Sequence, residues 1–463
     1  MARIFLSTPT KMPAWLDVAR QLSRGPHQVV GQLTHLPDEL SRSSIPWKLI
    51  DATQPRREYL SSTSLFNGQA TDDYAAVWAK HAEIFRGLLN RKIWYAFNKE
   101  ERSVFNFFCR YWQSVLEGVN PNVIVFATTP HTCYDYPLLV LANRMNIKTM
   151  VFTKVPYTEF SFVRNSIFED YCSLQKVSKR SQKSGDNVVW SGWLERCRGD
   201  YSSTRPSKWD KSKNYSKPDF RSLRLWSTAL YQRPFAVARL LLEKLASSSK
   251  WDNLEETYVN LSKPPDYSKR YVYLPLHFQP ERTTSPEGGV YHDQTKFATH
   301  ISESLPDNTK LYIREHPSQF KNYRGWMGRS SGYYDDLLDI NSVELISLDA
   351  NPFKLIDSAT AVASVAGTAV IESIIRGTPA TIGGCPWFCP GIPYPSHSRE
   401  SMQEFFSEGL GDIDCMQNRL SKFMHLLPSL SERCYIQGSD AHDHSVSRSQ
   451  NADALCALIK SSL

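Results

Sequence analysis

The chain has 463 residues, of which 41% are hydrophobic, 12% aromatic and 22% charged. This composition excludes wholesale disorder, and 21 Gly with 27 Pro exclude collagen-like and low-complexity chains. At roughly 150 residues per domain, the length predicts three domains or two large ones. No stretch approaches the roughly 18 consecutive apolar residues of a membrane-spanning helix. The N-terminus also lacks the apolar region of a signal peptide, so we expect a cytoplasmic chain.

The net charge of +7 is mild and partly local. The stretch from Arg205 to Arg224 is basic and rich in Ser and Pro, which is typical of a loop. It can be a solvated linker, or it can meet anionic lipid headgroups or a polyanionic polymer. No zinc finger, basic zipper or RNA-binding signature occurs, so we expect no nucleic-acid partner. Cys385 and Cys389 are the closest Cys pair and lack a second pair, so we expect reduced thiols and no metal site.

The first half of the chain predicts an α/β pattern. A short strand at 3–7 precedes a helix over 15–22, and residues 68–117 have a helical, aromatic-rich pattern. The apolar run 123–127 predicts a buried strand, 136–146 a helix and 148–153 the next strand. Strand, helix and strand in this order predict a βαβ unit with parallel strands.

Residues 201–267 interrupt this pattern with the basic loop and two predicted helices, 225–246 and 251–261. A second α/β pattern follows, with strands at 271–276, 309–314, 343–346, 361–365 and 379–382 and helices at 294–305, 352–358 and 369–376. The alternation predicts an α/β fold with two Rossmann-type lobes and a cleft between them. We expect lobes at 1–200, on the acceptor side, and at 268–400, with 201–267 as a helical connector and 401–463 as C-terminal helices.

The loop after the strand 271–276 contains three candidate site residues. A carboxylate at Glu281, beside Arg282 and several hydroxyls, can act as a general base or a nucleophile. His277 can hydrogen-bond a phosphate or orient that carboxylate. The alternative is a surface turn, because Pro280 and the following glycines are turn residues.

The strand 309–314 ends in Arg314-Glu-His316-Pro317. Pro317 biases His316 towards an extended backbone. His316 can then present a ring N–H to a phosphate oxygen, and Arg314 can add positive charge. The alternative is that His316 is an ordinary packed loop residue.

The block from Ser364 to Pro379 has the pattern strand, Gly-Thr, helix, Gly-x-Pro and strand. Gly367 permits a close approach of the backbone, and Thr368 can start a helix whose free N–H groups point at an anion. Glu372, one turn further on, is within reach of ribose hydroxyls. The pattern is typical of a nucleotide-sugar site, and simple helix capping is the alternative.

A fourth loop, 128–135, follows the buried strand of the first lobe. His131 or Asp135 can act as an acid or base or hold an acceptor sugar, whereas Asp135 can also simply cap the next helix. The chain has no P-loop, nucleophile elbow, kinase motif, His-Glu-x-x-His or Gly-rich dinucleotide fingerprint.

These blocks together resemble the capsule polysaccharide synthesis family of bacterial glycosyltransferases. The resemblance rests on Pro275-Leu-His-Phe-Gln-Pro-Glu281-Arg-Thr-Thr-Ser, Asp293-Gln294, Arg314-Glu-His-Pro317, Val365-Ala-Gly-Thr-Ala-Val-Ile-Glu372 and Gly377-Thr-Pro379. It covers 270–385 well and 120–155, including Pro130-His131, loosely.

The resemblance implies a GT-B-like architecture with a nucleotide-activated donor in the C-terminal lobe. Its best understood relatives are retaining transferases of Kdo, a 2-keto acid sugar, from CMP-Kdo, so CMP-linked donors are favoured over UDP-linked ones. By this analogy His316 contacts the CMP phosphate, and Ser364 with Gly367-Thr368 completes the phosphate site. The relatives use an Asp as nucleophile, for which Glu281 is the nearest equivalent and Asp293 a substitute.

From these features we expect a glycosyltransferase that extends a bacterial surface polysaccharide or its lipid-linked precursor, with no resident cofactor. Glu281 would act as nucleophile if the enzyme is retaining and as base if it is inverting, and Arg282 would bind the carboxylate of an acidic donor. A peripheral position at the inner face of the cytoplasmic membrane fits the basic loop. The alternatives are a sugar-nucleotide 2-epimerase and a non-catalytic assembly or export partner that binds polysaccharide or membrane through 205–224.

Overall fold

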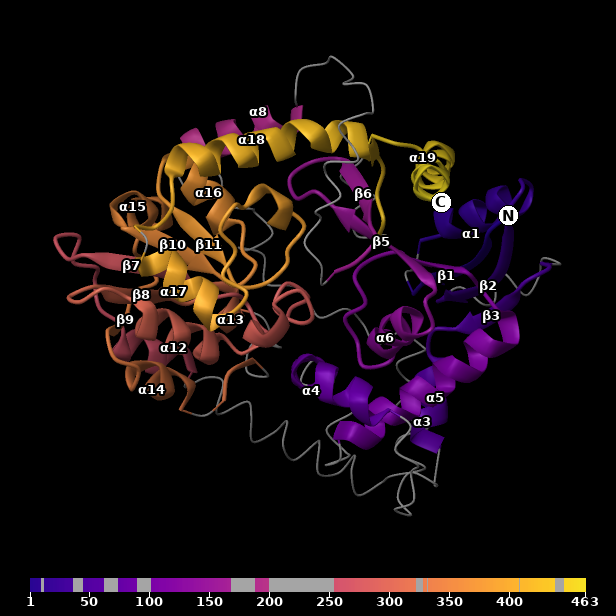
Figure 1. The fold of residues 1–463 in the computed structure, drawn as a ribbon, viewed down its shortest axis with the longest axis horizontal. Helices are drawn as coiled ribbons and strands as arrows, with labels where there is room; N and C mark the ends of the chain where they lie inside the picture. The colour runs from indigo at the N-terminus through magenta and orange to yellow at the C-terminus, as the bar shows by residue number, and fades with distance from the viewer. Residues whose placement is uncertain are drawn as a thin grey trace. The chain divides into compact units, whose positions relative to one another are not determined.

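The structure is a computed structural model that describes residues 1–9, 12–35, 45–61, 74–89, 101–167, 188–199, 254–321, 328–330, 332–407, 409–437 and 445–463. These residues form two compact units, one made of 1–167 with 427–463 and the other lying within 188–426. The expected basic loop 205–224 and helix 225–246 lie outside the described residues. Each unit is an α/β layer structure built on its own sheet (Figure 1).

The first unit has a seven-stranded sheet in the order β12-β6-β5-β4-β1-β2-β3. Its strands are β1 (Arg3–Thr8), β2 (Gln28–Thr34), β3 (Lys48–Asp51), β4 (Val123–Phe126), β5 (Lys148–Lys154), β6 (Phe160–Arg164) and β12 (Ser431–Arg433). The strands from β5 to β3 are parallel, whereas β6 is antiparallel to both of its neighbours. Because β4, the next helix and β5 follow one another with parallel strands, the predicted βαβ unit is confirmed.

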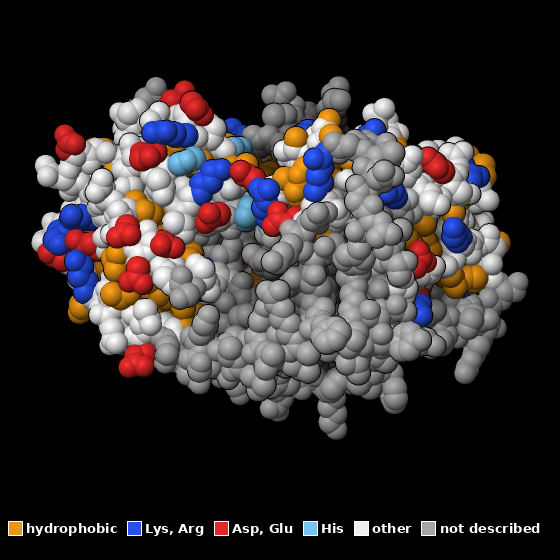
Figure 2. Space-filling model, turned by 90° about the horizontal axis from the view of Figure 1, so that it is seen from below, with side chains coloured by type: hydrophobic (Ala, Val, Ile, Leu, Met, Phe, Trp, Pro, Cys, Tyr) orange, Lys and Arg blue, Asp and Glu red, His pale blue; other side chains and the backbone are white. Residues whose placement is uncertain are grey.

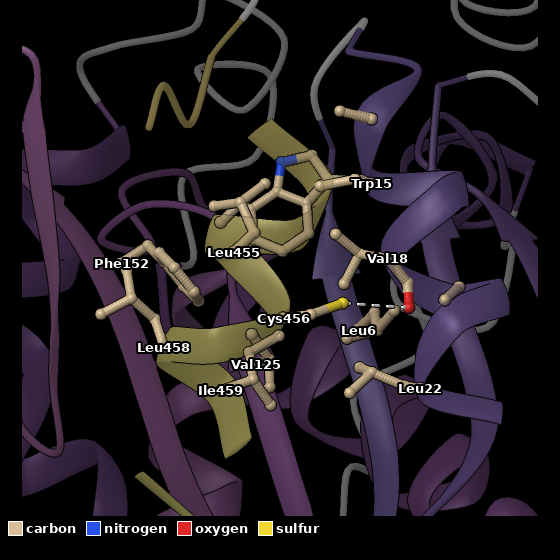
Figure 3. Close-up of a cluster of buried hydrophobic side chains, with 14 of the residues drawn as sticks. Leu6, Trp15, Val18, Leu22, Val125, Phe152, Leu455, Cys456, Leu458 and Ile459 are labelled. Carbon is tan, nitrogen blue, oxygen red and sulfur yellow. Dashed lines mark hydrogen bonds between the residues drawn. The ribbon is translucent and has the colours of Figure 1, made fainter. Parts of the chain in front are cut away.

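Helices cover both faces of this sheet. They are α1 (Ala14–Ser23), α3 (Gln54–Ser61), α4 (Ala75–Leu89), α5 (Glu101–Val119), α6 (Tyr136–Arg144) and α19 (Arg448–Ser462). Helix α1 packs against α19 on one face, and their apolar side chains meet Leu6, Val125 and Phe152 from the sheet (Figure 3). On the other face α5 packs against α6, so the sheet is buried on both sides, as parallel sheets normally are.

The second unit has a five-stranded, fully parallel sheet in the order β11-β10-β7-β8-β9. Its strands are β7 (Tyr271–Pro275), β8 (Lys310–Arg314), β9 (Val343–Leu345), β10 (Ala361–Ser364) and β11 (Ala380–Ile382). The chain starts in the middle at β7, builds outwards to β9, and then returns to the other side of β7. This is the doubly wound order, and all five predicted strands are confirmed.

Helices again lie on both faces of the second sheet. They are α8 (Val188–Arg198), α12 (Gln294–Ser304), α13 (Ser318–Lys321), α14 (Tyr333–Leu338), α15 (Pro352–Ser358), α16 (Ala369–Arg376), α17 (Arg399–Ser407) and α18 (Ile413–Leu430), with 3₁₀ turns η4 (Gly289–His292) and η6 (Cys389–Gly391). Helices α15, α16 and α8 pack together, while α12 packs against α14 and α17. Local signals set the ends: Asn351 caps α15 through its side chain, and Gly377, at φ 90°, ends α16 in the left-handed conformation.

Two expectations need correction in the C-terminal part. Helices alone were expected for 401–463, but residues 431–433 form the edge strand β12 of the first sheet. Residues 427–463 thereby belong to the first unit and do not form a separate set of helices.

Wherever the structure describes a helix, that helix is too short or too polar to cross a membrane.

Candidate functional site

The second sheet reverses its winding direction between β7 and β10. Ligands of open α/β sheets bind beyond the carboxyl ends of the strands at such a point. His277 lies two residues after the end of β7, and Ser364 is the last residue of β10. Their side chains meet there, because His277 Nε2 is 3.1 Å from Ser364 Oγ. The sheet therefore brings together two of the predicted site residues across 87 positions of sequence.

His277 braces the turn that follows β10. Its Nε2 accepts a hydrogen bond from the backbone N–H of Ala366 at 3.1 Å, so the ring proton of the neutral imidazole lies on Nδ1. Ser364 Oγ accepts from the backbone N–H of Gly367, also at 3.1 Å. The side chain of His277 thus holds the turn, and any contact of this residue with a ligand would have to come from Nδ1.

The side chains that brace this turn leave no room for a Cβ atom at Gly367. A Cβ at this position would lie 2.7 Å from Ser364 Oγ and 3.1 Å from His277 Cε1. Real Cβ contacts are longer than this, so any larger residue must displace one of the two side chains that form the brace.

Gly367→Ala should therefore lower the free energy of unfolding by about 1–3 kcal/mol, the usual cost of overpacking. The matched control is Gly192→Ala in α8, where nothing lies within 4 Å of the added methyl group. That variant should gain up to about 1 kcal/mol, because Ala is the better helix former. Urea denaturation of both variants measures the difference, and equal stabilities would show that the turn is not tightly packed.

The turn leaves fewer amides for an anion than the sequence predicts. The N–H groups of Ala366 and Gly367 are already used by His277 and Ser364. Among the described residues, the amides of Thr368 and Ala369 have no acceptor, and both residues are partly exposed. They stand at the start of α16, whose dipole favours a negative charge at that end. This opening can bind one phosphate or carboxylate group.

His316 follows β8, the strand next to β7. Its Nδ1 accepts from the backbone N–H of Ser318 at 3.1 Å, so the proton of the neutral ring lies on Nε2. Burial, followed by the charge of His316, lowers the pKa of His277. His316 is only partly buried and can present Nε2–H to a ligand. Arg314 is nearly buried, and its Nη2 donates to the carbonyl of Leu348 at 2.6 Å, which commits part of this guanidinium to the fold.

The loop 281–289 contains two carboxylates. Glu281 is exposed and accepts from Thr283 Oγ1 at 3.2 Å, whereas Glu287 is 4% exposed and lies 3.8 Å from Arg282 Nε. The loop packs on the end of β10, since a Cβ on Gly288 would lie 2.8 Å from Val365 Cγ1. Glu281 and Arg282 are thus attached to the same edge of the sheet as His277. Glu287 was not predicted as a site residue, and no sequence signal distinguishes it from its neighbours.

Asp293 and Glu372 have structural partners. Asp293 is the N-cap of α12, where its side chain accepts from the backbone N–H of Thr295 at 3.0 Å. Glu372 faces α8, with Oε1 3.7 Å from Arg196 Nε, and burial raises the pKa of its carboxyl. Its proposed contact with a ribose remains a prediction.

The predicted acceptor residues lie in the first unit, after β4. Asp135 accepts from the backbone N–H of Thr132 at 2.6 Å and precedes α6 without capping it through its side chain. His131 Nδ1 lies 2.7 Å from the carbonyl of Thr129. Both side chains shape this loop, and their role in holding an acceptor remains a prediction.

A buried ion pair was missed entirely by the sequence analysis. Glu315 and Arg329 are both fully buried, with 2.7 Å between Oε2 and Nε. Glu315 lies inside the predicted Arg-Glu-His-Pro motif, so its position was noticed but its role was not. Nothing in the sequence marks Arg329.

The described part of the surface in Figure 2 carries Lys and Arg side chains interspersed with Asp and Glu, and His side chains lie among them. Within the described ranges, no group of three or more His, Cys, Asp or Glu side chains is arranged to hold a metal ion.

Burial should make the stability of the protein depend on His277 in mild acid. Burial lowers the pKa of His277 from 6.5 to about 3. Between these values the unfolded chain binds a proton that the folded chain does not, so the free energy of unfolding falls as the pH falls. At about 1.4 kcal/mol per pH unit below 6.5, this group costs about 2 kcal/mol at pH 5 relative to pH 7.

The test compares wild type with His277→Gln, whose amide oxygen can still accept from Ala366. Urea denaturation measures how much the free energy of unfolding falls between pH 7 and pH 5. This fall should be about 2 kcal/mol smaller in the variant than in wild type. Other titrating groups, such as His81, contribute equally to both proteins. Identical losses in the two proteins would contradict the buried, neutral state of His277.

No protein-family profile and no curated protein matches the chain. The solved structures that resemble it include Thermosulfurimonas dismutans KpsC, a beta Kdo 2,7 transferase, at 12% identity and a TM-score of 0.30, over 63% of this chain and 78% of that one. The UDP-GlcNAc 2-epimerase from Methanocaldococcus jannaschii has 11% identity and a TM-score of 0.23, over 91% of this chain and 99% of that one. MnaA from S. aureus, in complex with UDP, has 10% identity and a TM-score of 0.25, over 92% of each chain. Because these TM-scores are low, we base the function on the geometry of this chain's own residues.

Proposed function

We propose that the protein is a glycosyltransferase that uses a nucleotide-activated sugar bound at the carboxyl edge of the second sheet. The observation that carries the proposal is the hydrogen-bonded cluster of His277, Ser364 and Gly367 at the reversal point of this sheet. It fixes the opening of α16 at the place where α/β proteins bind nucleotides, and His316 follows β8, the strand next to β7.

The phosphate of the donor would sit at the start of α16. The amides of Thr368 and Ala369 and the helix dipole would stabilise its negative charge. His316 Nε2–H would donate to a phosphate oxygen, and Arg314 would add positive charge nearby. These groups would bind the phosphate more strongly as it leaves with a developing charge, which is how donors fixed in advance accelerate a reaction.

The transfer exchanges one C–O bond for another at the anomeric carbon. The bond from this carbon to the phosphate oxygen breaks, and its electron pair leaves with the phosphate. An acceptor hydroxyl forms the new bond and gives up its proton to a carboxylate, for which Glu281 is our candidate. In a retaining reaction Glu281 would first attack the carbon itself, and the acceptor would displace it in a second step.

The motif resemblance favours a donor of the CMP-Kdo type and an acceptor on a bacterial surface polysaccharide or its lipid-linked precursor. Arg282 would pair with the carboxylate of such an acidic sugar, since a guanidinium binds a carboxylate through two hydrogen bonds. Its present neighbour is Glu287, at 3.8 Å.

A panel of nucleotides and nucleotide sugars, with CMP and UDP compounds first, tests the proposal through protection against thermal unfolding. A ligand at 100 times its Kd should stabilise the folded protein by about 2.7 kcal/mol. Protection by at least one nucleotide, followed by sugar transfer to an added acceptor, would support it. Conversion of the donor to its isomer without an acceptor would replace it by a 2-epimerase, and binding of polysaccharide or membrane without any nucleotide affinity would replace it by an assembly partner.

A further inference from the structure

We infer that Glu315, Arg329 and Tyr334 form a buried unit that positions the two imidazoles of the site, His277 and His316. Neither charged residue touches solvent, so neither can contact a ligand directly. The role of this unit in nucleotide binding rests on the proposed function.

Every hydrogen-bonding position of the carboxylate is filled. Glu315 Oε1 accepts from the backbone N–H of His316 at 2.6 Å and from Arg329 Nη2 at 2.9 Å. Oε2 accepts from Arg329 Nε at 2.7 Å and from Tyr334 Oη at 2.8 Å. A carboxylate has about four such positions, so protein groups alone satisfy this buried carboxylate.

The guanidinium is equally saturated. Besides its two bonds to Glu315, Arg329 donates from Nη2 to the carbonyl of His277 at 2.9 Å. Its Nη1 donates to the side-chain oxygen of Gln279 at 2.7 Å and to the carbonyl of Gly328 at 2.9 Å. All five N–H groups of an arginine are therefore used. Burial alone would lower the pKa of Arg329, but the adjacent carboxylate raises it above its ordinary value, so the pair stays charged.

The pair holds one peptide group beside each imidazole. The carboxylate binds the N–H of His316, and the guanidinium binds the C=O of His277. These residues follow two neighbouring strands, β8 and β7, so the pair ties the two strand-end loops into one rigid piece. A buried ion pair can often be replaced by apolar residues without loss of stability. Apolar residues could not, however, form the directed hydrogen bonds by which this pair holds the two loops.

Tyr334→Phe provides a test that should leave the protein folded. It removes one of the four bonds to Glu315, and it should shift the ¹⁵N signals of the His316 ring and weaken nucleotide binding about tenfold. The matched control is Tyr271→Phe, a fully buried tyrosine on β7 whose hydroxyl donates to the carbonyl of Leu355. It should lower the unfolding temperature by a similar amount but leave the imidazole signals and the nucleotide affinity as in wild type.

Arg329→Lys is the second variant. It keeps the charge but loses the planar fork, so it should shift the signals of both His277 and His316. Wild-type imidazole signals in both Tyr334→Phe and Arg329→Lys would overturn the inference even if the protein binds nucleotides. If wild type binds no nucleotide, the proposed function fails, and the imidazole signals still decide whether the unit positions the two rings.

Discussion

Arg329→Met is expected to lower the free energy of unfolding by about 3–5 kcal/mol. The variant removes the guanidinium and leaves the carboxylate of Glu315 buried without its counter-ion. It also removes one of the two donors to the carbonyl of His277, the other being Gln294 Nε2, and the donor to the side-chain oxygen of Gln279. Urea denaturation, followed by a probe in the second unit, measures the loss.

The matched control is Arg399→Met in the same unit. Arg399 pairs with Glu303 at 3.0 Å, but both side chains are exposed, at 51% and 41%. Pairs of this kind contribute about 0–1 kcal/mol because water screens them. Equal losses in Arg329→Met and Arg399→Met would show that the buried pair is not an integral part of the fold.

The double variant Glu315→Leu with Arg329→Met separates stability from positioning. Removing the carboxylate that lacks its counter-ion should recover much of the lost stability, because apolar residues of similar volume replace buried ion pairs well. Nucleotide affinity should stay low, because the C=O of His277 has lost its bond to Arg329 and the N–H of His316 its bond to Glu315. Recovery of both properties would reduce the pair to a structural element.

His316→Ala is expected to lower kcat/KM for sugar transfer by about 10²–10³-fold, the usual effect of removing one donor to a developing anion. The ring is partly exposed, so the variant should fold normally. His425→Ala, on the exposed side of α18, is the control and should keep the wild-type rate. An unchanged rate in His316→Ala would remove this residue from the mechanism.

Glu281→Gln complements that experiment. It keeps the size of the side chain and removes the charge, so nucleotide binding should persist while transfer stops. Persistence of both would leave Glu287 as the carboxylate to examine in this loop.

The second sheet was predictable because its signals are local. The helices 352–358 and 369–376 were predicted with their observed ends, since the Asn351 cap and the left-handed Gly377 act within one turn.

In the first sheet the strands β2 and β3 were missed. β2 contains Gln28, Gln32 and Thr34 among its seven residues, so no apolar run marks it, although six of the seven are buried. Gln32 is accommodated there by its bond to Thr8 Oγ1, a tertiary contact.

In the site, too, features set by local sequence could be predicted, whereas features set by tertiary contacts could not. His277, Ser364 and Gly367 lie at or just after strand ends and could be found from turn chemistry, and the structure joins them by hydrogen bonds. The use of the Ala366 amide within the turn could not be found in this way, because it depends on His277, which follows another strand. The pairing of Glu315 with Arg329 was likewise invisible, since only the folded chain brings the two residues together.

A crystal structure of the protein with bound CMP is the most direct test of a nucleotide site at the edge of the second sheet. We expect the phosphate within hydrogen-bonding distance of the amides of Thr368 and Ala369 and of His316 Nε2. Phosphate density elsewhere on the protein, with this opening of α16 left to solvent, would contradict it.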